Sequence, residues 1–416
     1  MHSREAEELK KLMITGSWPT LLSLLLILAL ASPGRATSLS FQDQLTRLAG
    51  DSGAAVVIDG RGKPLVSYNS QKPLVPASIL KIITSYFALE TLGTDFRFKT
   101  NFYLDNRNNL YVKGFCDPYI VSEELRLMAR ALYDRGVKVV NNIILDQTLF
   151  TDYEIPGCTG TANPYNANIY PISVNFNTVT LTRKKGRFLS ADPETPTTDF
   201  LRRVGQKTAF KQHSLVNTNV MGREALLYPG YLLEVMLKEL GVRRTGNTVK
   251  LGQVPQGWPV YYQHANSHNL YETITELMKY SNNFLANAIL INYSMAKTSE
   301  GSVATGARLI NQELRQMGLT QTRIFEGSGL SLDNQTTAQE MVAILARFKP
   351  YRGVMMTPKT LNKWGVPCKT GTMPQEGVYS LAGYLDNDRP FVIIINDKPH
   401  NGESRRLLLN LLRDSL

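Results

Sequence analysis

The sequence of 416 residues has few of the side chains that form disulfides or bind metal ions. It contains three cysteines and five histidines, and no Cys-x-x-Cys spacing occurs. Only His264 and His268 stand four residues apart, and no third ligand lies beside them, so we expect two surface histidines rather than a metal site. Cys116 and Cys158 could pair in an exported protein, but the sequence leaves this open. No metal or cofactor is therefore expected.

Long apolar runs are also scarce. One occurs near the N-terminus in "WPTLLSLLLILALASPG", residues 18–34, after Lys10 and Lys11. It has the length of a signal peptide and is short for a membrane span. Residues 1–36 are predicted to be a signal peptide, with Ala31 or Ala36 at the cleavage site, or else an uncleaved anchor. The rest of the chain is then exported to the periplasm or cell envelope, and only this segment would contact a membrane.

Acidic residues are fewer than basic ones, and the net charge is +11. An exported basic protein is attracted to anionic polymers and surfaces of the cell envelope. The local basic clusters, residues 182–187 and 241–246, are short and carry no interleaved aromatic residues. This composition argues against nucleic-acid binding. The oligomeric state cannot be read from the sequence.

The two ends of the chain share a pattern that its middle lacks. Residues 53–70 and 378–397 each predict a β-hairpin, residues 270–319 a block of helices, and residues 402–414 a final amphipathic helix. Residues 97–114, 137–146 and 173–183 predict further strands, and residues 230–241 a helix. We therefore predict an α/β (α+β) domain from residues 37–95 and 265–416, with an antiparallel sheet flanked by helices. Residues 96–264 would form a mainly β insertion.

Three short motifs follow one another along the chain. Each has an ordinary interpretation of its own: a helix start, a helix cap and a strand entry. In this order, S-x-x-K, S-x-N and K-T-G are typical of serine enzymes that recognise penicillin. The motifs are Ser78-x-x-Lys81, Ser281-Asn282-Asn283 and Lys369-Thr370-Gly371 followed by Thr372.

Longer stretches support the same interpretation. "PASILKIITSYFALETLG", "NPYNANIYPISVNFN", "YSNNFLANAIL" and "EGSGLSLDN" resemble landmarks of the D-alanyl-D-alanine carboxypeptidase/endopeptidase family of low-molecular-mass penicillin-binding proteins. This is the penicillin-binding protein 4 type, peptidase family S13. The resemblance implies a transpeptidase-like fold with an insertion between the first two motifs. Three features depart from the family pattern: a shorter insertion, "GFCDP" at residues 114–118, and Cys368 before Lys369.

The resemblance also implies a role for each motif residue. Ser78 would be the nucleophile and Lys81 its base, Ser281 would relay a proton, and Asn283 would bind a substrate amide. Lys369 would attract the terminal carboxylate of the substrate. The adjoining residues Thr370, Gly371 and Thr372 would bind substrate, and the backbone N–H groups of Ser78 and Thr372 would form the oxyanion hole.

Two other features are expected to be structural. The "GSGLS" stretch, residues 327–331, is interpreted as a tight loop near the site, and Asp152 as a surface acid rather than a substrate contact. The expected activity is that of a serine-type D-Ala-D-Ala carboxypeptidase, a DD-endopeptidase or both. Peptidoglycan stem peptides would be the substrates and β-lactams the inhibitors. The alternatives are a β-lactamase or esterase on the same scaffold, and a non-catalytic wall-binding protein.

Overall fold

The computed structural model describes residues 39–208, 213–355, 364–397 and 402–416. The predicted signal peptide or anchor, residues 1–36, lies outside them. The chain divides into two compact units, Met1–Gln44 and Leu45–Leu416. The first helix described is α3 (Phe41–Ala49). No helix in the described part of the chain is both long enough and apolar enough to cross a membrane.

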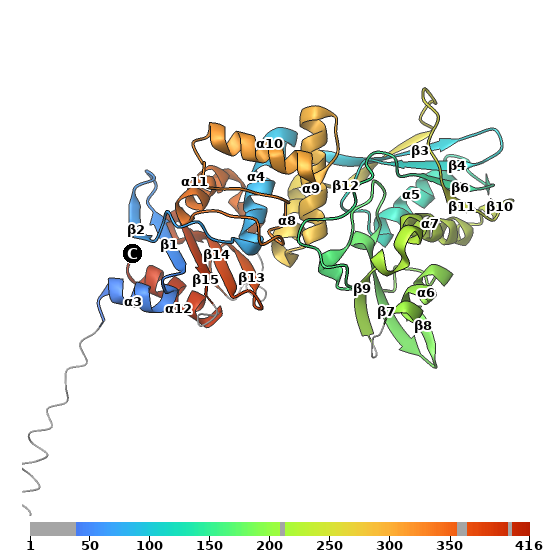
Figure 1. The fold of residues 1–416 in the computed structure, drawn as a ribbon. Coiled ribbons are helices and arrows are strands. Elements are labelled where there is room, and N and C mark those ends of the chain that lie inside the picture. The colour runs from blue at the N-terminus through green and yellow to red at the C-terminus, as the bar shows by residue number, and fades with distance from the viewer. Residues whose placement is uncertain (1–38, 209–212, 356–363, 398–401) are drawn as a thin grey trace, which may run out of the picture. The chain divides into compact units, whose positions relative to one another are not determined.

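The two ends of the second unit build one antiparallel sheet (Figure 1). In the described ranges this sheet is five-stranded, in the order β13-β14-β15-β1-β2. Its strands are β1 (Gly53–Ile58), β2 (Pro64–Tyr68), β13 (Cys368–Met373), β14 (Val378–Leu385) and β15 (Arg389–Asn396). Ala55 of β1 lies opposite Ile393 of β15, although the two residues are far apart in the sequence. The predicted hairpins at both ends and the predicted fold class are confirmed.

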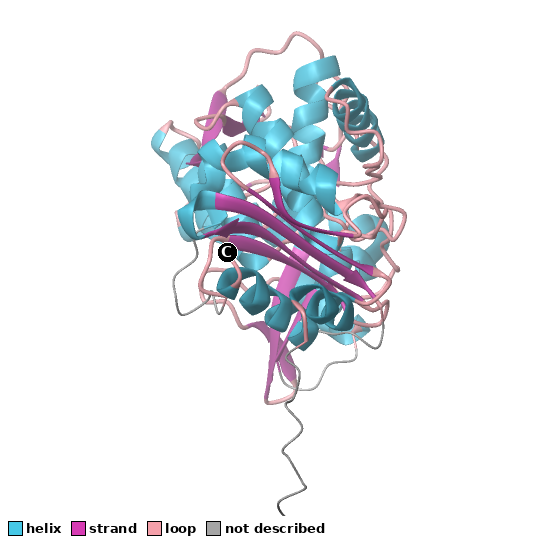
Figure 2. Ribbon diagram, turned by 90° about the vertical axis from the view of Figure 1, so that its left-hand side faces the viewer, coloured by secondary structure: helices cyan, strands magenta, loops and turns pink. Residues whose placement is uncertain are grey.

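Helices cover both faces of this sheet (Figure 2). Every residue of β1 is buried, as expected for a strand that is covered on both faces. Helix α11 (Ala338–Phe348) packs on β1 and β15, and α12 (Gly402–Asp414) packs on β14 and β15. Alternate residues of β15 therefore face different helices.

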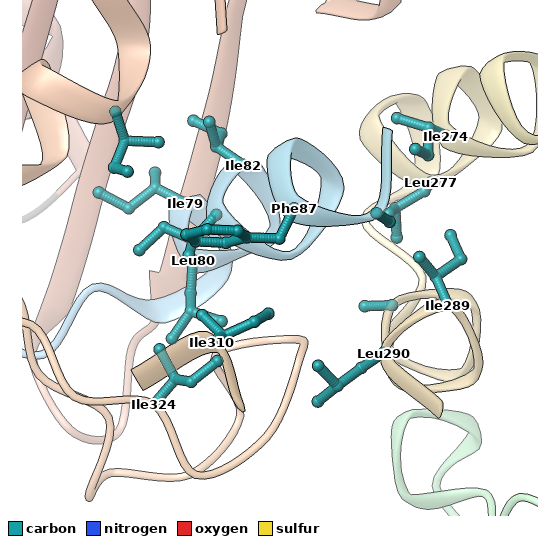
Figure 3. Packing of buried hydrophobic residues seen from close by; sticks show 14 of the residues in the cluster. Ile79, Leu80, Ile82, Phe87, Ile274, Leu277, Ile289, Leu290, Ile310 and Ile324 are labelled. Atoms are coloured by element: carbon teal, nitrogen blue, oxygen red, sulfur yellow. The ribbon is translucent and has the colours of Figure 1, made fainter. Parts of the chain in front are cut away.

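A group of helices packs beside α11 and shares its core. They are α4 (Lys81–Leu92), α8 (Leu270–Tyr280), α9 (Asn283–Thr298) and α10 (Val303–Gln316), as the helical pattern of residues 270–319 predicted. Figure 3 shows Phe87, Leu277, Ile289 and Ile310 in this core, all of them buried. Burying a side chain of this kind stabilises a fold by about 1.5–3 kcal/mol. The core holds α4 and α9 against each other, which matters because both carry motif residues.

The middle of the chain forms separate sheets with their own core. The larger sheet contains β3 (Arg97–Leu104), β4 (Leu110–Gly114), β6 (Ile143–Asp146), β11 (Val249–Leu251) and β12 (Tyr262–Asn269). The smaller sheets contain β7 (Thr178–Lys184), β8 (Arg187–Ser190) and β9 (His213–Asn217), and β5 (Val139–Val140) with β10 (Arg243–Arg244). The segment expected to be mainly β also contains helices α5 (Ser122–Asp134), α6 (Asp199–Lys207) and α7 (Tyr228–Glu239).

Two local predictions in this segment were wrong. The strand predicted for residues 173–183 begins only at Thr178, because Asn175, Phe176 and Asn177 have positive φ angles that a strand cannot hold. His264, expected at the surface, is 6% exposed, and its Nε2 lies 2.5 Å from Glu124 Oε1. The pairing of β12 with β3 turns this side chain toward α5 instead of solvent.

Candidate active site

Ser78 lies in a short 3-10 turn, η1 (Ala77–Leu80), that precedes α4. The sequence predicted a helix start here, but the α-helix itself begins only at Lys81. Ala77 has a φ of 48°, an unusual conformation for a residue with a side chain. Pro76 N-caps the turn. The turn leaves Ser78 partly exposed while its neighbours Ala77 and Ile79 are buried.

Lys81 is completely buried and donates three hydrogen bonds. Its Nζ lies 2.8 Å from Ser78 Oγ, 2.8 Å from Asn283 Oδ1 and 2.7 Å from the carbonyl oxygen of Ser328. All three acceptors are neutral, and no carboxylate of the described residues forms a hydrogen bond with the amine. Burial lowers the pKa of Lys81 well below its usual value, and the charge of Lys369 lowers it further, whereas the charge of Glu326 opposes this shift. A low pKa is what a lysine needs in order to act as a base.

Lys369 forms a second buried lysine pair with the S-x-N motif. Its Nζ lies 2.8 Å from Ser281 Oγ and 2.8 Å from the carbonyl oxygen of Thr370. Burial lowers the pKa of Lys369 to about 7; nearby Arg405 contributes in the same direction, and Cys368 opposes it. Ser281, at the junction of α8 and α9, has a φ of 56°, so its backbone is in the left-handed region and does not continue helix α8.

The helix-cap interpretation of the second motif holds for two of its residues, because Ser281 is the C-cap residue of α8 and Asn282 is the N-cap residue of α9. The side chain of Asn282 accepts a hydrogen bond from the backbone N–H of Leu285 and caps α9. Asn283 begins α9 and, as noted, contacts Lys81. The S-x-N motif therefore has two roles: its central residue starts the helix, and the flanking residues face the two lysines.

Strand β13 passes directly beneath the Ser78 turn. A Cβ atom built on Gly371 would lie 2.8 Å from Ser78 N and 2.9 Å from the carbonyl oxygen of Pro76, so only glycine fits there without a shift. The Ser380 hydroxyl on β14 donates to the same Pro76 oxygen at 2.6 Å and fastens the turn to the sheet. Of the three motif residues that follow Lys369, Thr372 lines the adjoining cleft, and Thr370 does not.

The cleft beside Ser78 has a volume of about 810 Å³. Ser78, Ser281, Asn283 and Thr372 lie along it together, as their predicted shared site requires. Its other walls come from residues 329–333, from residues 373–376, and from the middle of the chain, which contributes Gly157, Thr159, Asn163, Tyr165 and Asn166. Asp152 is exposed and is not among the lining residues. One wall of the cleft is thus formed by residues that are far in sequence from all three motifs.

Sequence reasoning missed Glu326, which organises the loop under Lys81. Its fully buried carboxylate accepts hydrogen bonds from the backbone N–H groups of Ser328, Gly329 and Leu330 at 2.6–2.7 Å. Asn334 Nδ2 donates to it at 2.7 Å. The carboxylate thereby holds the Ser328 carbonyl that accepts from Lys81. The acidic residue directly before "GSGLS" was the available signal, because such loops expose several N–H groups that need an acceptor.

Neither a metal-ligand cluster nor a disulfide occurs among the described residues. No group of three or more His, Cys, Asp or Glu side chains suited to a metal ion occurs among the described residues. All three cysteines are free, so the pairing of Cys116 with Cys158 that the sequence left open is not present. Burial raises the pKa of Cys368, next to Lys369, to about 12, which keeps this thiol protonated at neutral pH.

Comparisons with known proteins give consistent matches. The model of the D-Ala-D-Ala carboxypeptidase 3 (S13) family matches residues 38–227 and 210–351. A D-alanyl-D-alanine carboxypeptidase from Actinomadura sp. (strain R39) is 26% identical over 428 residues, covering 84% of this chain and 78% of that protein.

Solved structures share the fold at low identity. Penicillin-binding protein 4 from Haemophilus influenzae is similar with a TM-score of 0.70 and 19% identity, covering 91% of this chain and 98% of the other. Bd3459, a predatory peptidoglycan endopeptidase from Bdellovibrio bacteriovorus, is similar with a TM-score of 0.53 and 14% identity, covering 88% and 91% of the two chains.

Proposed function

Since the chain belongs to the D-Ala-D-Ala carboxypeptidase 3 (S13) family and is a serine carboxypeptidase, we propose that it cleaves peptidoglycan stem peptides through an acyl-enzyme on Ser78. The observation that carries this proposal is the 2.8 Å hydrogen bond between Ser78 Oγ and the buried amine of Lys81. A serine hydroxyl is a weak nucleophile at neutral pH unless a base takes its proton. Lys81, with its lowered pKa, is that base.

In its neutral form Lys81 donates two hydrogen bonds and its lone pair accepts one from the Ser78 hydroxyl. In the first step it takes the proton of Ser78 Oγ as this oxygen attacks the carbonyl carbon of the penultimate D-Ala. The carbonyl oxygen becomes an oxyanion, and the backbone N–H groups of Ser78 and Thr372 stabilise it. Donors of this kind contribute about 2.7–4 kcal/mol each to the transition state. The close approach of Gly371, the neighbour of Thr372 in β13, to Ser78 N supports this assignment.

The carbon–nitrogen bond then breaks and the leaving amine takes a proton. Ser281 relays it, since its hydroxyl is bonded to Lys369. Water hydrolyses the resulting ester and frees Ser78. Lys369 and the hydroxyl of Thr372, which lines the cleft, attract the terminal carboxylate of the substrate. Asn283 binds a substrate amide through the side chain that also holds Lys81.

A larger leaving group is a second proposal, and it would make the enzyme a DD-endopeptidase. The cleft of about 810 Å³ is of the size that encloses ligands much larger than one amino acid. Carboxypeptidase action releases free D-Ala, whereas endopeptidase action releases a crosslinked partner peptide. The cleft between residues 157–166 and 329–333 is large enough for either leaving group, D-Ala or a crosslinked peptide.

The order of segments along the chain suggests a division into two domains behind an export signal. We propose that residues 37–95 and 265–416 form the catalytic domain and residues 96–264 the inserted domain. Each motif residue lies in the first of these parts, and the second contributes, among the described residues, the cleft wall at residues 157–166. The apolar segment in residues 1–36 and the net charge of +11 fit export to the periplasm or cell envelope, where anionic wall polymers lie.

Intact-mass spectrometry with benzylpenicillin tests the nucleophile. We expect one drug mass to be added to the wild type and none to Ser78→Ala. Ser67→Ala, an exposed hydroxyl on β2, is the matched control and should be labelled like the wild type. A folded wild type that leaves the drug intact and forms no adduct would overturn the acyl-enzyme, and rapid consumption of the drug would point to a β-lactamase. Release of D-Ala is then measured against release of crosslinked peptides.

A further inference from the structure

Arg405, on α12, lies behind the strand that carries the third motif. It is 6% exposed, unlike its neighbour Arg406, which is exposed. Its Nη1 lies 2.8 Å from the carbonyl oxygen of Gly371, 2.7 Å from that of Ser380 and 3.2 Å from Thr372 Oγ1. The guanidinium carbon also lies 4.9 Å from the ring centre of Trp364. One buried cation therefore contacts both strands at the edge of the sheet next to the nucleophile.

The two carbonyl acceptors belong to residues that pair directly across the sheet. Gly371 and Ser380 lie directly opposite each other in the pairing of β13 with β14. Gly371 is also the residue that closely approaches Ser78 N, and the Ser380 hydroxyl donates a hydrogen bond to the Pro76 carbonyl oxygen. Arg405 thus donates hydrogen bonds to the same pair of residues that supports the turn containing Ser78.

The hydrogen bond from Arg405 determines whether the Thr372 hydroxyl can act as a donor or as an acceptor toward a further partner. A hydroxyl has one proton to donate, and an arginine can only donate. Since Thr372 Oγ1 accepts from Arg405, the proton of this hydroxyl is available to another partner, and Thr372 is among the residues that line the cleft. An anionic acceptor gains most from such a donor.

Arg405 also adds positive charge behind this hydroxyl. Its hydrogen bonds to the described residues all go to neutral oxygens. Burial lowers the pKa of Arg405 to about 10, so the guanidinium is still charged at neutral pH. A buried charge that neutral groups contact acts over a longer distance than an exposed one, because solvent screens it less.

We propose that Arg405 is a positioning residue that aims the Thr372 hydroxyl at the terminal carboxylate of the substrate and so makes the enzyme select peptides with a free C-terminal carboxylate. This inference rests on the proposed function and adds a residue that lies outside all three motifs. Arg405 itself does not touch the substrate.

The test compares two substrates that differ only at the C-terminus, an N-acyl-D-Ala-D-Ala peptide and its C-terminal carboxamide. A charge-assisted hydrogen bond is worth about 1.5–3 kcal/mol, or roughly 10- to 100-fold. We expect Arg405→Gln to lower kcat/KM for the carboxylate by about this factor and to change kcat/KM for the carboxamide much less. Arg405→Lys keeps the charge but loses the fork geometry, and should give an intermediate ratio. Arg406→Gln is the matched control and should leave the ratio unchanged.

A parallel loss on both substrates would mean that Arg405 only supports the fold, and would overturn the proposal. Thr372→Val gives an independent test if Arg405→Gln does not fold: it must lower the same carboxylate-to-carboxamide ratio, and an unchanged ratio overturns the proposal as well. A wild type that cleaves neither peptide and forms no benzylpenicillin adduct refutes the proposed function itself, which is a different result from equal losses in the variants.

Discussion

Lys81 Nζ lies 2.8 Å from Ser78 Oγ, and the two residues belong to different helical turns. Ser78 is in a 3-10 turn and Lys81 is the first residue of an α-helix. The side chain of Lys81 is bonded at the same time to α9 and to the loop that follows Glu326. The pair is therefore held by three segments of the chain that the core brings together.

Replacement of Lys81 should abolish most of the reaction with Ser78. We expect Lys81→Met to slow acylation by benzylpenicillin by about 10²- to 10⁴-fold, the usual contribution of a positioned base. Rapid-quench mass spectrometry measures this rate. Lys238→Met, an exposed position on α7, should acylate at the wild-type rate. A wild-type rate in Lys81→Met would show that another group takes the proton.

The charge of Lys369 should influence the pH at which Lys81 becomes neutral and can act as the base. Lys81 must be neutral, so acylation falls as the pH drops through its lowered pKa. The positive charge of Lys369 helps to lower that pKa, so Lys369→Met should raise it and move the acid limb of the rate profile to higher pH. Acylation rates measured between about pH 5 and about pH 9 give the midpoint. Exposed Lys63→Met should leave the midpoint in place, and a limb that moves to lower pH would contradict the geometry.

Lys369 should also make stability depend on pH. Its pKa falls from an ordinary value of 10.5 to about 7 in the fold. Between these values the unfolded chain binds more protons than the folded one, so the free energy of unfolding rises with pH over this window. Lys369→Met should lose this part of the rise. Urea unfolding of both proteins at the two ends of the window measures the difference, and equal slopes would contradict the lowered pKa.

Gly371 should tolerate no side chain. A Cβ there would lie 2.2 Å from Ser380 Oγ and 2.8 Å from Ser78 N, so the nucleophile turn and β13 must separate. A displacement of about 1 Å can cost about 10²-fold in rate, and we expect Gly371→Ala to lose acylation to this extent. At Gly60 a new Cβ meets nothing within 4 Å, which makes Gly60→Ala the matched control. Unchanged acylation in Gly371→Ala would show that the turn does not rest on the strand.

The Glu326 carboxylate should be needed for the stability of its loop. Glu326→Gln keeps the shape but places an NH₂ group among donors from Ser328, Gly329 and Leu330. We expect the free energy of unfolding to fall by about 2–4 kcal/mol, because buried donors lose their acceptor. Urea unfolding measures this, and exposed Glu123→Gln should change it by less than about 0.5 kcal/mol. An unchanged midpoint would mean that the loop is held by other contacts.

Much of the fold could be predicted because its signals are local. The hairpins of residues 53–70 and 378–397 alternate or run apolar between turn residues, and residues 270–319 have helical spacing. Errors occurred where a local signal competed with another interaction. Residues 175–177 look like a strand but hold positive φ angles, and His264 is polar but finds a buried partner in Glu124.

The sequence by itself determined the order of the motifs and the residues to which we assign the proposed reaction, namely Ser78, Lys81, Ser281, Asn283 and Lys369. Only the tertiary structure decided how these residues are held. Glu326 and Arg405 lie outside the motifs, and the cleft wall at residues 157–166 comes from the middle of the chain. Their roles depend on burial and on contacts that form only in the folded chain. The loop held by Glu326 reaches Lys81, although Ser328 and Lys81 are 247 residues apart in the sequence. The lowered pKa values of the two lysines have the same origin, because desolvation exists only once the core has closed around them.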